Sequence, residues 1–198
     1  MSNEIHRVKL NDICAATKAG LSSYYFKKRE EEGTKMSVVN IKDVRDGYID
    51  SSDIDYIDVH VTSAIENSKI NVGDIIVSTK GSNLRTAVAD KNIEGFVFSA
   101  NLTVLTLKQE IDPEIVVSYL NSSYGQQELN KRAGGSTFRT LNTKQLLEVP
   151  VPVPLLEKQQ ELGRLLKDIR EYTQSLTEEA NKWTQIAEET VIRTLELR

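Results

Sequence analysis

The distribution of hydrophobic residues divides the chain into two parts at a proline-rich segment. Before Val149, short apolar runs rich in β-branched residues alternate with polar turns, which is typical of strands mixed with short helices. Beyond Pro154 the apolar residues recur at helical spacing, and no further proline follows. The pattern predicts an α+β fold, with a mixed αβ domain at residues 1–150 followed by one long coiled-coil-type helix at 155–198.

The predicted domain contains several strands and two or three helices. Strands are expected at 6–10, 35–44, 70–82 and 85–108, the last interrupted by turns at 90–92 and 94–95. Residues 10–20 read as a short helix that Asn11 or Asp12 opens and Gly20 ends. A further helix is expected at 112–132, because an Asp-Pro pair suits the first turn of a helix.

The long helix carries an apolar stripe that we call the seam, and that we predict to be the surface for a dimer or partner helix. It consists of Leu162, Leu165, Ile169, Tyr172, Leu176 and Trp183. A helix of about 40 residues is roughly 60 Å long, whereas a domain of 150 residues has a radius of gyration of roughly 15 Å. Much of the seam therefore needs another helix. The alternative is a helix folded back over its own domain.

Three of the four prolines, Pro150, Pro152 and Pro154, occupy alternate positions just before this helix. Alternating prolines hold the backbone extended and exclude helix, which predicts a short stiff spacer at 151–154. An edge strand with prolines on its free side is an equally compatible interpretation.

Composition narrows the class of protein. The 198 residues are 39% hydrophobic, enough for one globular core and an appendage. The single cysteine, Cys14, excludes an internal disulfide framework and a cysteine-based zinc site, and it fits a reducing compartment. With a polar N-terminus and no run of about 20 apolar residues, the chain is expected to be cytoplasmic and to have no membrane partner. Net charge is −4, so nucleic-acid contact would have to come from local basic clusters.

Catalytic and metal-binding patterns are not found in the sequence. His6 and His60 are far apart and belong to no recognisable catalytic or metal motif. There is no P-loop, dinucleotide-binding, nucleophile-elbow or HExxH motif. No lysine has an acidic residue two positions before it, an element common in metal-dependent nucleases. We therefore predict that the chain is not an enzyme, with no catalytic residue and no metal.

Three basic-polar clusters are candidate DNA contacts. The 79–85 loop, TKGSNLR, contributes Lys80, Ser82, Asn83 and Arg85, and the 131–142 loop, KRAGGSTFRTLN, contributes Ser136, Thr137 and Arg139. A third cluster, SSYYFKKR at 22–29, places aromatic residues beside cations. Arg can read guanine and Asn can read adenine, while Ser and Thr reach phosphates or bases. Each cluster taken alone also fits an ordinary solvated loop.

The order of these pieces resembles the specificity (S) subunit of type I restriction-modification systems over nearly the whole chain. The matching stretches are HRVKLNDIC, VVNIKDVRDGYID, VGDIIVSTKGS, FVFSANLTVLTL and YLNSSYGQQELNKRAGGSTFRTLNTKQLLEVPVPVPLLEKQ. The last is the most specific. It joins a YLNS helix, a Gly-Ser-Thr loop and alternating prolines to a Leu-Leu-Glu-x-Gln helix start.

The resemblance implies a target recognition domain that reads one half of an interrupted double-stranded DNA site, and a spacer helix that docks methyltransferase subunits. Family members usually hold two such domains and two antiparallel helices. With one of each, this sequence resembles a half-subunit, the single-recognition-domain form. A homodimer would restore the architecture and read a split, palindromic site. It would guide a DNA adenine methyltransferase subunit, which would bind S-adenosylmethionine, and in a complete system an endonuclease subunit.

Two other functions remain open from the residues alone. The chain could be an orphan interaction protein that dimerises and sequesters partner subunits without reading DNA. It could also be an enzyme with an unrecognised site. A variant of the first hypothesis pairs the chain with a different half-subunit, which would give an asymmetric target.

Overall fold

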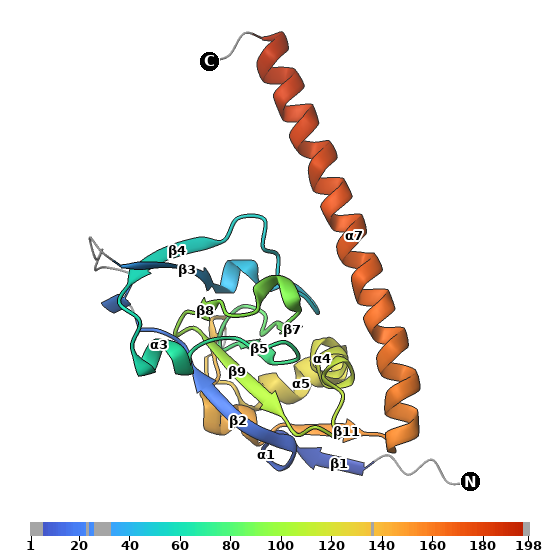
Figure 1. Cartoon of the computed structure of the whole chain (residues 1–198). Coiled ribbons are helices and arrows are strands. Elements are labelled where there is room, and N and C mark those ends of the chain that lie inside the picture. The colour runs from blue at the N-terminus through green and yellow to red at the C-terminus, as the bar shows by residue number, and fades with distance from the viewer. Residues whose placement is uncertain (1–5, 23, 26–32, 136, 196–198) are drawn as a thin grey trace.

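A computed structural model describes the chain except for residues 1–5, 23, 26–32, 136 and 196–198. It has the predicted α+β fold, in which a mixed domain is followed by one long helix (Figure 1). The elements are β1 (His6–Lys9), α1 (Leu10–Ile13), β2 (Cys14–Ala19), β3 (Thr34–Val39), β4 (Asp55–Val59), α3 (Ser63–Asn67), β5 (Ile75–Ser78), β6 (Lys80–Gly81), β7 (Thr86–Val88), β8 (Val97–Phe98), β9 (Leu102–Leu107), α4 (Pro113–Asn121), α5 (Ser123–Arg132), β10 (Arg139–Thr140), α6 (Thr143–Leu147), β11 (Pro150–Val153) and α7 (Leu156–Thr194).

The centre of the domain is an antiparallel sheet in the order β2-β9-β5-β7. Strand β5 is buried on both faces, and its side chains alternate between two cores. Ile75 and Val77 belong to the cluster that includes Val116 and Leu120 of α4, and Ile76 belongs to the cluster on the opposite face with Phe98. The period of two in a strand explains how one apolar run serves both cores.

A second sheet, in the order β4-β3-β8, has a small core of its own. Strand β3 pairs antiparallel with β4 and parallel with β8. Figure 1 shows β3 and β4 as a long ribbon at the edge of the domain opposite β1 and β11.

Two local predictions are wrong. Residues 10–20 form only one helical turn, α1, after which 14–19 extend as β2 and pair with β9. Sheet pairing there overrides the weak helix preference of the segment CAATKA. The helix expected at 112–132 is two helices, because Ser122 ends α4 and its hydroxyl caps α5 by accepting from the amide of Gly125 at 3.2 Å.

The proline segment is an edge strand of the domain. Strand β11 pairs antiparallel with β1, with Pro150 opposite Lys9 and Pro152 opposite Arg7. Val151, between the two prolines, is buried. Prolines are tolerated there because an edge strand needs backbone donors on one side only. The stiff segment before α7 is therefore built into the sheet, as the edge-strand interpretation expected.

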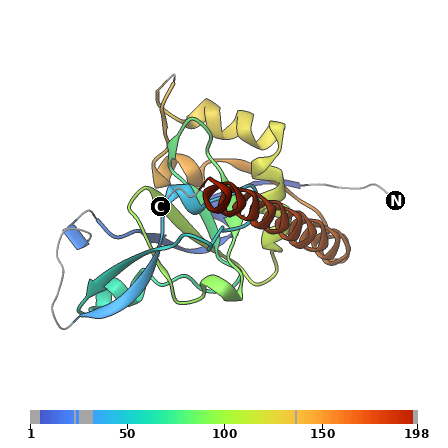
Figure 2. The ribbon, with the colours of Figure 1, turned by 90° about the horizontal axis from the view of Figure 1, so that it is seen from above.

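Helix α7 is 39 residues long, which corresponds to roughly 58 Å. Its first half lies beside α4, and its second half extends beyond the domain (Figure 1). Figure 2 looks down on the molecule and close to the axis of α7, which is therefore foreshortened. In the described part of the chain, no helix is both long and apolar enough to span a membrane.

Candidate nucleic-acid interface

The fold brings together the two loops that the sequence singles out. Strand β6 of the 79–85 loop pairs antiparallel with β10 of the 131–142 loop, with Lys80 opposite Thr140 and Gly81 opposite Arg139. Just past the pair, the amide of Leu141 donates to the carbonyl oxygen of Thr79 at 2.9 Å. The two loops therefore form one surface, which we call the β6–β10 ribbon.

Backbone hydrogen bonds close the second loop at its base. Gly134 and Thr140 exchange two of them, at 2.8 and 2.9 Å. Gly135 has φ +85°, and a Cβ atom there would lie 2.2 Å from the carbonyl oxygen of Phe138. Glycine is therefore required at this turn both for its positive φ and for the close approach of the backbone.

The ribbon presents cations and hydroxyls to solvent. Lys80 and Arg139 are half-buried, whereas Ser82, Asn83 and Thr137 are exposed. Within the described residues neither cation has an ion pair or a side-chain hydrogen bond. Ser136, the remaining predicted contact of this loop, lies outside the described residues.

An aromatic residue at the tip of the ribbon was missed by the sequence reasoning. Phe138 is 63% exposed, between Thr137 and Arg139. An isolated Phe in a Gly-Ser-Thr loop was the available signal. It is the kind of residue that contacts a thymine methyl group or a sugar at a DNA interface.

Arg85 lies apart from the other predicted contacts. Its Nε atom is 3.6 Å from Oδ1 of Asp46, and its Nη1 donates to the carbonyl oxygen of Val44 at 3.4 Å. Although its side chain is partly exposed, its charge is turned towards the 44–46 loop. The structure groups Lys80 with Arg139 and leaves Arg85 engaged elsewhere.

The third cluster is described only in part. Tyr24 and Tyr25 stack edge-to-face with ring centroids 5.6 Å apart. Tyr25 packs against the core of the β4-β3-β8 sheet, and Tyr24 is exposed. Of the rest of the predicted cluster, residues 23 and 26–29 lie outside the described residues.

A cavity of about 510 Å³ adjoins the ribbon at Lys80. It is lined by Leu21, Ser22, Asn40, Lys80, Ser99, Ala100 and Asn101. Thr79, beside Lys80, connects the ribbon to this cavity, because its amide and its hydroxyl both donate to the carbonyl oxygen of Asn101, at 3.0 and 2.8 Å.

Cys14 is a structural residue of β2. Burial raises the pKa of its thiol to about 11, so the thiolate is scarce at neutral pH. Within the described residues, no group of three or more His, Cys, Asp or Glu side chains is arranged to hold a metal ion.

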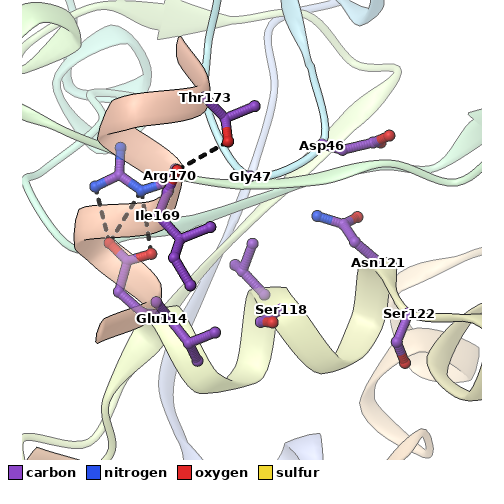
Figure 3. A pocket seen from close by; sticks show the side chains of 11 residues that line it. Asp46, Gly47, Glu114, Ser118, Asn121, Ser122, Ile169, Arg170 and Thr173 are labelled. Carbon is purple, nitrogen blue, oxygen red and sulfur yellow. Dashed lines mark hydrogen bonds and ion pairs between the residues drawn. The ribbon is translucent and has the colours of Figure 1, made fainter. Parts of the chain in front are cut away.

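The first half of α7 is anchored to the domain by polar contacts. Arg170 donates to both carboxylate oxygens of Glu114 in α4, with distances of 2.8 and 3.1 Å, as Figure 3 shows. The Arg170 and Glu114 side chains are only 8% and 10% exposed. This bidentate pair fixes the side of α7 that faces the domain.

Two further contacts lie nearer the start of α7. The Gln159 side chain accepts from the amide of Asp112 at 3.1 Å and donates to the carbonyl oxygen of Pro154 at 3.0 Å. A Cβ atom on Gly163 would lie 2.0 Å from a carboxylate oxygen of Asp112, so glycine permits the close approach of the two helices. Sequence reasoning missed these anchors, although the lone glycine in a long helix was the signal.

The predicted seam does not pack on its own domain. All six seam residues are exposed, from Leu162 near the start to Trp183, which is 65% exposed. Ile169 also borders a groove of about 290 Å³ between α7, α4 and the Asp46–Gly47 turn (Figure 3). The anchoring residues and the seam therefore occupy different sides of one helix.

Comparisons with known proteins agree with this architecture. The family model described as type I restriction modification DNA specificity domain matches residues 3–183. The chain is 24% identical over 146 residues to the type I restriction enzyme EcoBI specificity subunit of Escherichia coli, covering 74% of this chain and 31% of that protein.

Solved structures show the same fold. The HsdS subunit from Thermoanaerobacter tengcongensis superposes with a TM-score of 0.61 at 20% identity, covering 95% of this chain and 48% of that one. A chain from a structure on complex assembly and conformational transition of the type I R-M system gives a TM-score of 0.62 at 21% identity, covering 98% and 50%. The sequence thus spans about a third of the curated relative and about half of each solved chain.

Proposed function

We propose, because the chain belongs to the family of type I restriction modification DNA specificity domains, that its domain reads one half of a split DNA site. In this proposal the chain is a non-catalytic specificity subunit. It directs a DNA adenine methyltransferase subunit, and in a complete system an endonuclease subunit, to that site. The methyltransferase partner binds S-adenosylmethionine and carries out the methyl transfer.

The observation that supports DNA reading is the pairing of β6 with β10. It joins Lys80, Arg139 and Thr137 in one exposed ribbon although they come from distant parts of the sequence. A two-stranded ribbon is narrow enough to enter a DNA major groove, where base edges are distinguishable. Because the chain carries 29 acidic against 25 basic residues, we assign much of the phosphate contact to the partner subunit.

The test is a selection from randomised duplex DNA. The protein is co-purified with its methyltransferase partner subunit, and the salt concentration is fixed. Enrichment of a two-part palindromic motif supports both recognition and self-pairing. Enrichment of an asymmetric motif supports DNA recognition but indicates that the second half-subunit is a different chain. An intact complex that enriches no motif contradicts the proposal and favours the sequestering alternative.

We infer further that the second copy pairs with the first through antiparallel α7 helices. An axis near residue 174 places Leu176 against Tyr172, Trp183 against Leu165, and Ile186 against Leu162. Glu179, opposite Ile169, is the polar residue in this arrangement. Large apolar side chains that are exposed in one copy thereby cover one another in the pair.

The charges beside the seam favour the same register. Along one edge of the pair, Ser175 of one copy faces Ser175 of the other. On either side of this position, Asp168 of one copy faces Lys182 of the other. Both charged residues are exposed, and no ion pair is recorded for either within the described residues. The like-charged Glu161 and Glu189 face each other only near the ends of the overlap, where solvent screens them.

A charge exchange tests this register. Asp168→Lys or Lys182→Asp alone creates two like-charge pairs and should weaken the dimer at low salt. The double variant restores opposite charges and should recover it. Sedimentation equilibrium at two salt concentrations measures both effects. If the double variant is as weak as the sum of the two single variants, the register is wrong.

A further inference from the structure

We propose that the cavity beside Lys80 holds a phosphodiester group of the DNA backbone, with Lys80 and Ser99 as its donors. This proposal rests on the proposed function, because it assigns a ligand to a place next to the β6–β10 ribbon. It extends the contact surface beyond the two loops that the sequence indicates. Its residues come from three further segments, at 21–22, 40 and 99–101.

The cavity is built from well-fixed backbone. The amide of Leu21 donates to the carbonyl oxygen of Phe98 at 2.7 Å, and the amide of Ala100 donates back to Leu21 at 2.9 Å. On the other side, Thr79 is tied to Asn101 by its amide and its hydroxyl. The volume of the cavity, about 510 Å³, is within the usual range of ligand sites.

The Ser99 hydroxyl is the feature that indicates a ligand. Ser99 is 6% exposed, and its Oγ atom is buried without a hydrogen-bond partner among the described residues. Leaving a buried hydroxyl unpaired costs free energy, so such groups are rare and require an explanation. Oγ is closed off from solvent in this conformation, so a ligand in the cavity reaches it only when the Ser99 side chain turns, and the hydrogen bond then gained supplies the explanation.

The lining of the cavity favours an anion. Lys80 brings a cation with no acidic partner among the described residues, and Ser22 and Asn101 add polar groups. None of the lining residues is acidic, in a chain with more acidic than basic residues. A cation beside hydroxyl donors matches phosphate oxygens, which accept hydrogen bonds but do not donate them.

The alternative ligand within DNA is a base edge. Adenine is read by a donor and an acceptor held as a fixed pair, which an Asn side chain provides. Of the two Asn in the lining, Asn40 already donates through Nδ2 to Oδ2 of Asp55 at 2.9 Å, and Asn101 is exposed with no hydrogen bond that fixes its amide among the described residues. Lys80 can also read guanine, and comparing a selected with an unrelated duplex separates that role from a phosphate contact. The donors that remain available, the Lys80 ammonium and the Ser99 hydroxyl, suit a phosphate better.

Ser99→Ala and Lys80→Ala test the proposal in the intact complex with the methyltransferase subunit. Affinity is measured for a selected duplex and an unrelated duplex at several salt concentrations. Ser99→Ala should weaken both duplexes by the same factor, about 2- to 10-fold. Lys80→Ala should also weaken both and should lower the salt slope by about one.

Matched controls separate this role from a structural one. Ser68 is equally buried, but its hydroxyl donates to the carbonyl oxygens of Ala64 and Ala19 at 2.9 and 3.3 Å. Ser68→Ala should lower the melting temperature and leave DNA affinity unchanged. Ser99→Ala should keep or raise the melting temperature while it weakens DNA binding, because it removes an unpaired hydroxyl. Lys91→Ala, in a cavity on another face, is the control for charge.

Three outcomes overturn the phosphate site. A loss confined to the selected duplex indicates a base contact instead. If the wild-type complex prefers its target and the variants bind both duplexes as tightly as the wild type does, the cavity does not hold a phosphate, but DNA recognition stands. Stabilisation of the free protein by inorganic phosphate, lost in Ser99→Ala while DNA affinity stays constant, indicates a free anion. A wild-type complex with no sequence preference contradicts the proposed function itself.

Discussion

The two halves of α7 carry the same apolar repeat but have different surroundings. The first half is fixed to its own domain by Gln159, Gly163 and Arg170, which are polar or small. The second half, with Leu176 and Trp183, is exposed along its length. The comparison shows that the periodic apolar residues are not what attaches the helix to its domain. They are available for a partner, while the attachment depends on a few specific contacts.

This division gives the helix a defined direction. Strand β11 holds the chain up to Val153, and the Arg170–Glu114 pair holds α7 more than a dozen residues later. Two fixed points along one stiff element set its angle to the domain. In an antiparallel pair, the same contacts would set the distance between the two recognition domains on DNA.

The largest predicted effect comes from disrupting the seam. Ile169→Asp with Leu176→Asp places four carboxylates in the paired seam and should convert the dimer into a monomer. Gln174→Asp with Asn181→Asp, on the side of the helix opposite the seam, is the matched control and should remain dimeric. Light scattering at micromolar concentration measures both. A wild-type monomer under these conditions contradicts self-pairing of the isolated protein.

The second prediction concerns the Arg170–Glu114 pair, which anchors α7 to the domain. Arg170→Ala leaves Glu114 buried without its cation and should lower the free energy of unfolding by about 3–5 kcal/mol. The double variant Arg170→Met with Glu114→Leu should cost much less, because no charge is left unpaired. Urea denaturation gives both values. Equal losses in the single and double variants would show that packing, and not the ion pair, holds this contact.

The third prediction concerns DNA and separates the two arginines that the sequence treated alike. Arg139→Ala should weaken specific binding by about 1–3 kcal/mol if its guanidinium reads a base. Arg85→Ala should have a smaller effect, because Arg85 is engaged with Asp46 and Val44. Titration of the methyltransferase complex with the selected duplex compares them. Unchanged affinity and unchanged target for both variants would remove both assignments.

The smallest predicted effect concerns the close approach of Gly163 to Asp112. Gly163→Ala forces Asp112 to move, and Asp112 caps α4 by accepting from the amide of Glu114 at 2.9 Å. Loss of a helix cap costs about 1 kcal/mol, which the better helix propensity of alanine partly offsets. Thermal unfolding should therefore show a small net destabilisation. A stabilised variant would mean that the two helices separate at little cost.

Much of this architecture could be predicted from periodicity alone. The repeat at Leu162, Ile169, Leu176 and Trp183 indicated the long helix, and the β-branched runs around Val38 and Ile76 indicated strands. These elements depend on local pattern, so a single sequence contains the information. The family resemblance rested on the segment from the YLNS helix to the start of α7, and the family match confirms it.

The two errors have different causes. Ser122 interrupts a helix that looked continuous through a local cap, in which its hydroxyl accepts from the amide of Gly125. Residues 14–19 became a strand because β9, which lies far away in the chain, pairs with them. The β6–β10 pair, the unpaired hydroxyl of Ser99 and the Glu114–Arg170 contact are likewise set by residues far apart in the chain. Contacts of this kind depend on tertiary geometry, which local propensity does not encode.

The central claim, that the exposed half of α7 is completed by an antiparallel second copy, can be tested by thiol crosslinking in a Cys14→Ala background. Ser175→Cys should crosslink with itself, because it lies at the proposed axis. Asp168→Cys and Lys182→Cys, each seven residues away, should not react alone, since equivalent positions are then about 20 Å apart. The two should crosslink when mixed. Self-crosslinking of all three would contradict the account, as would the absence of any crosslink at Ser175→Cys.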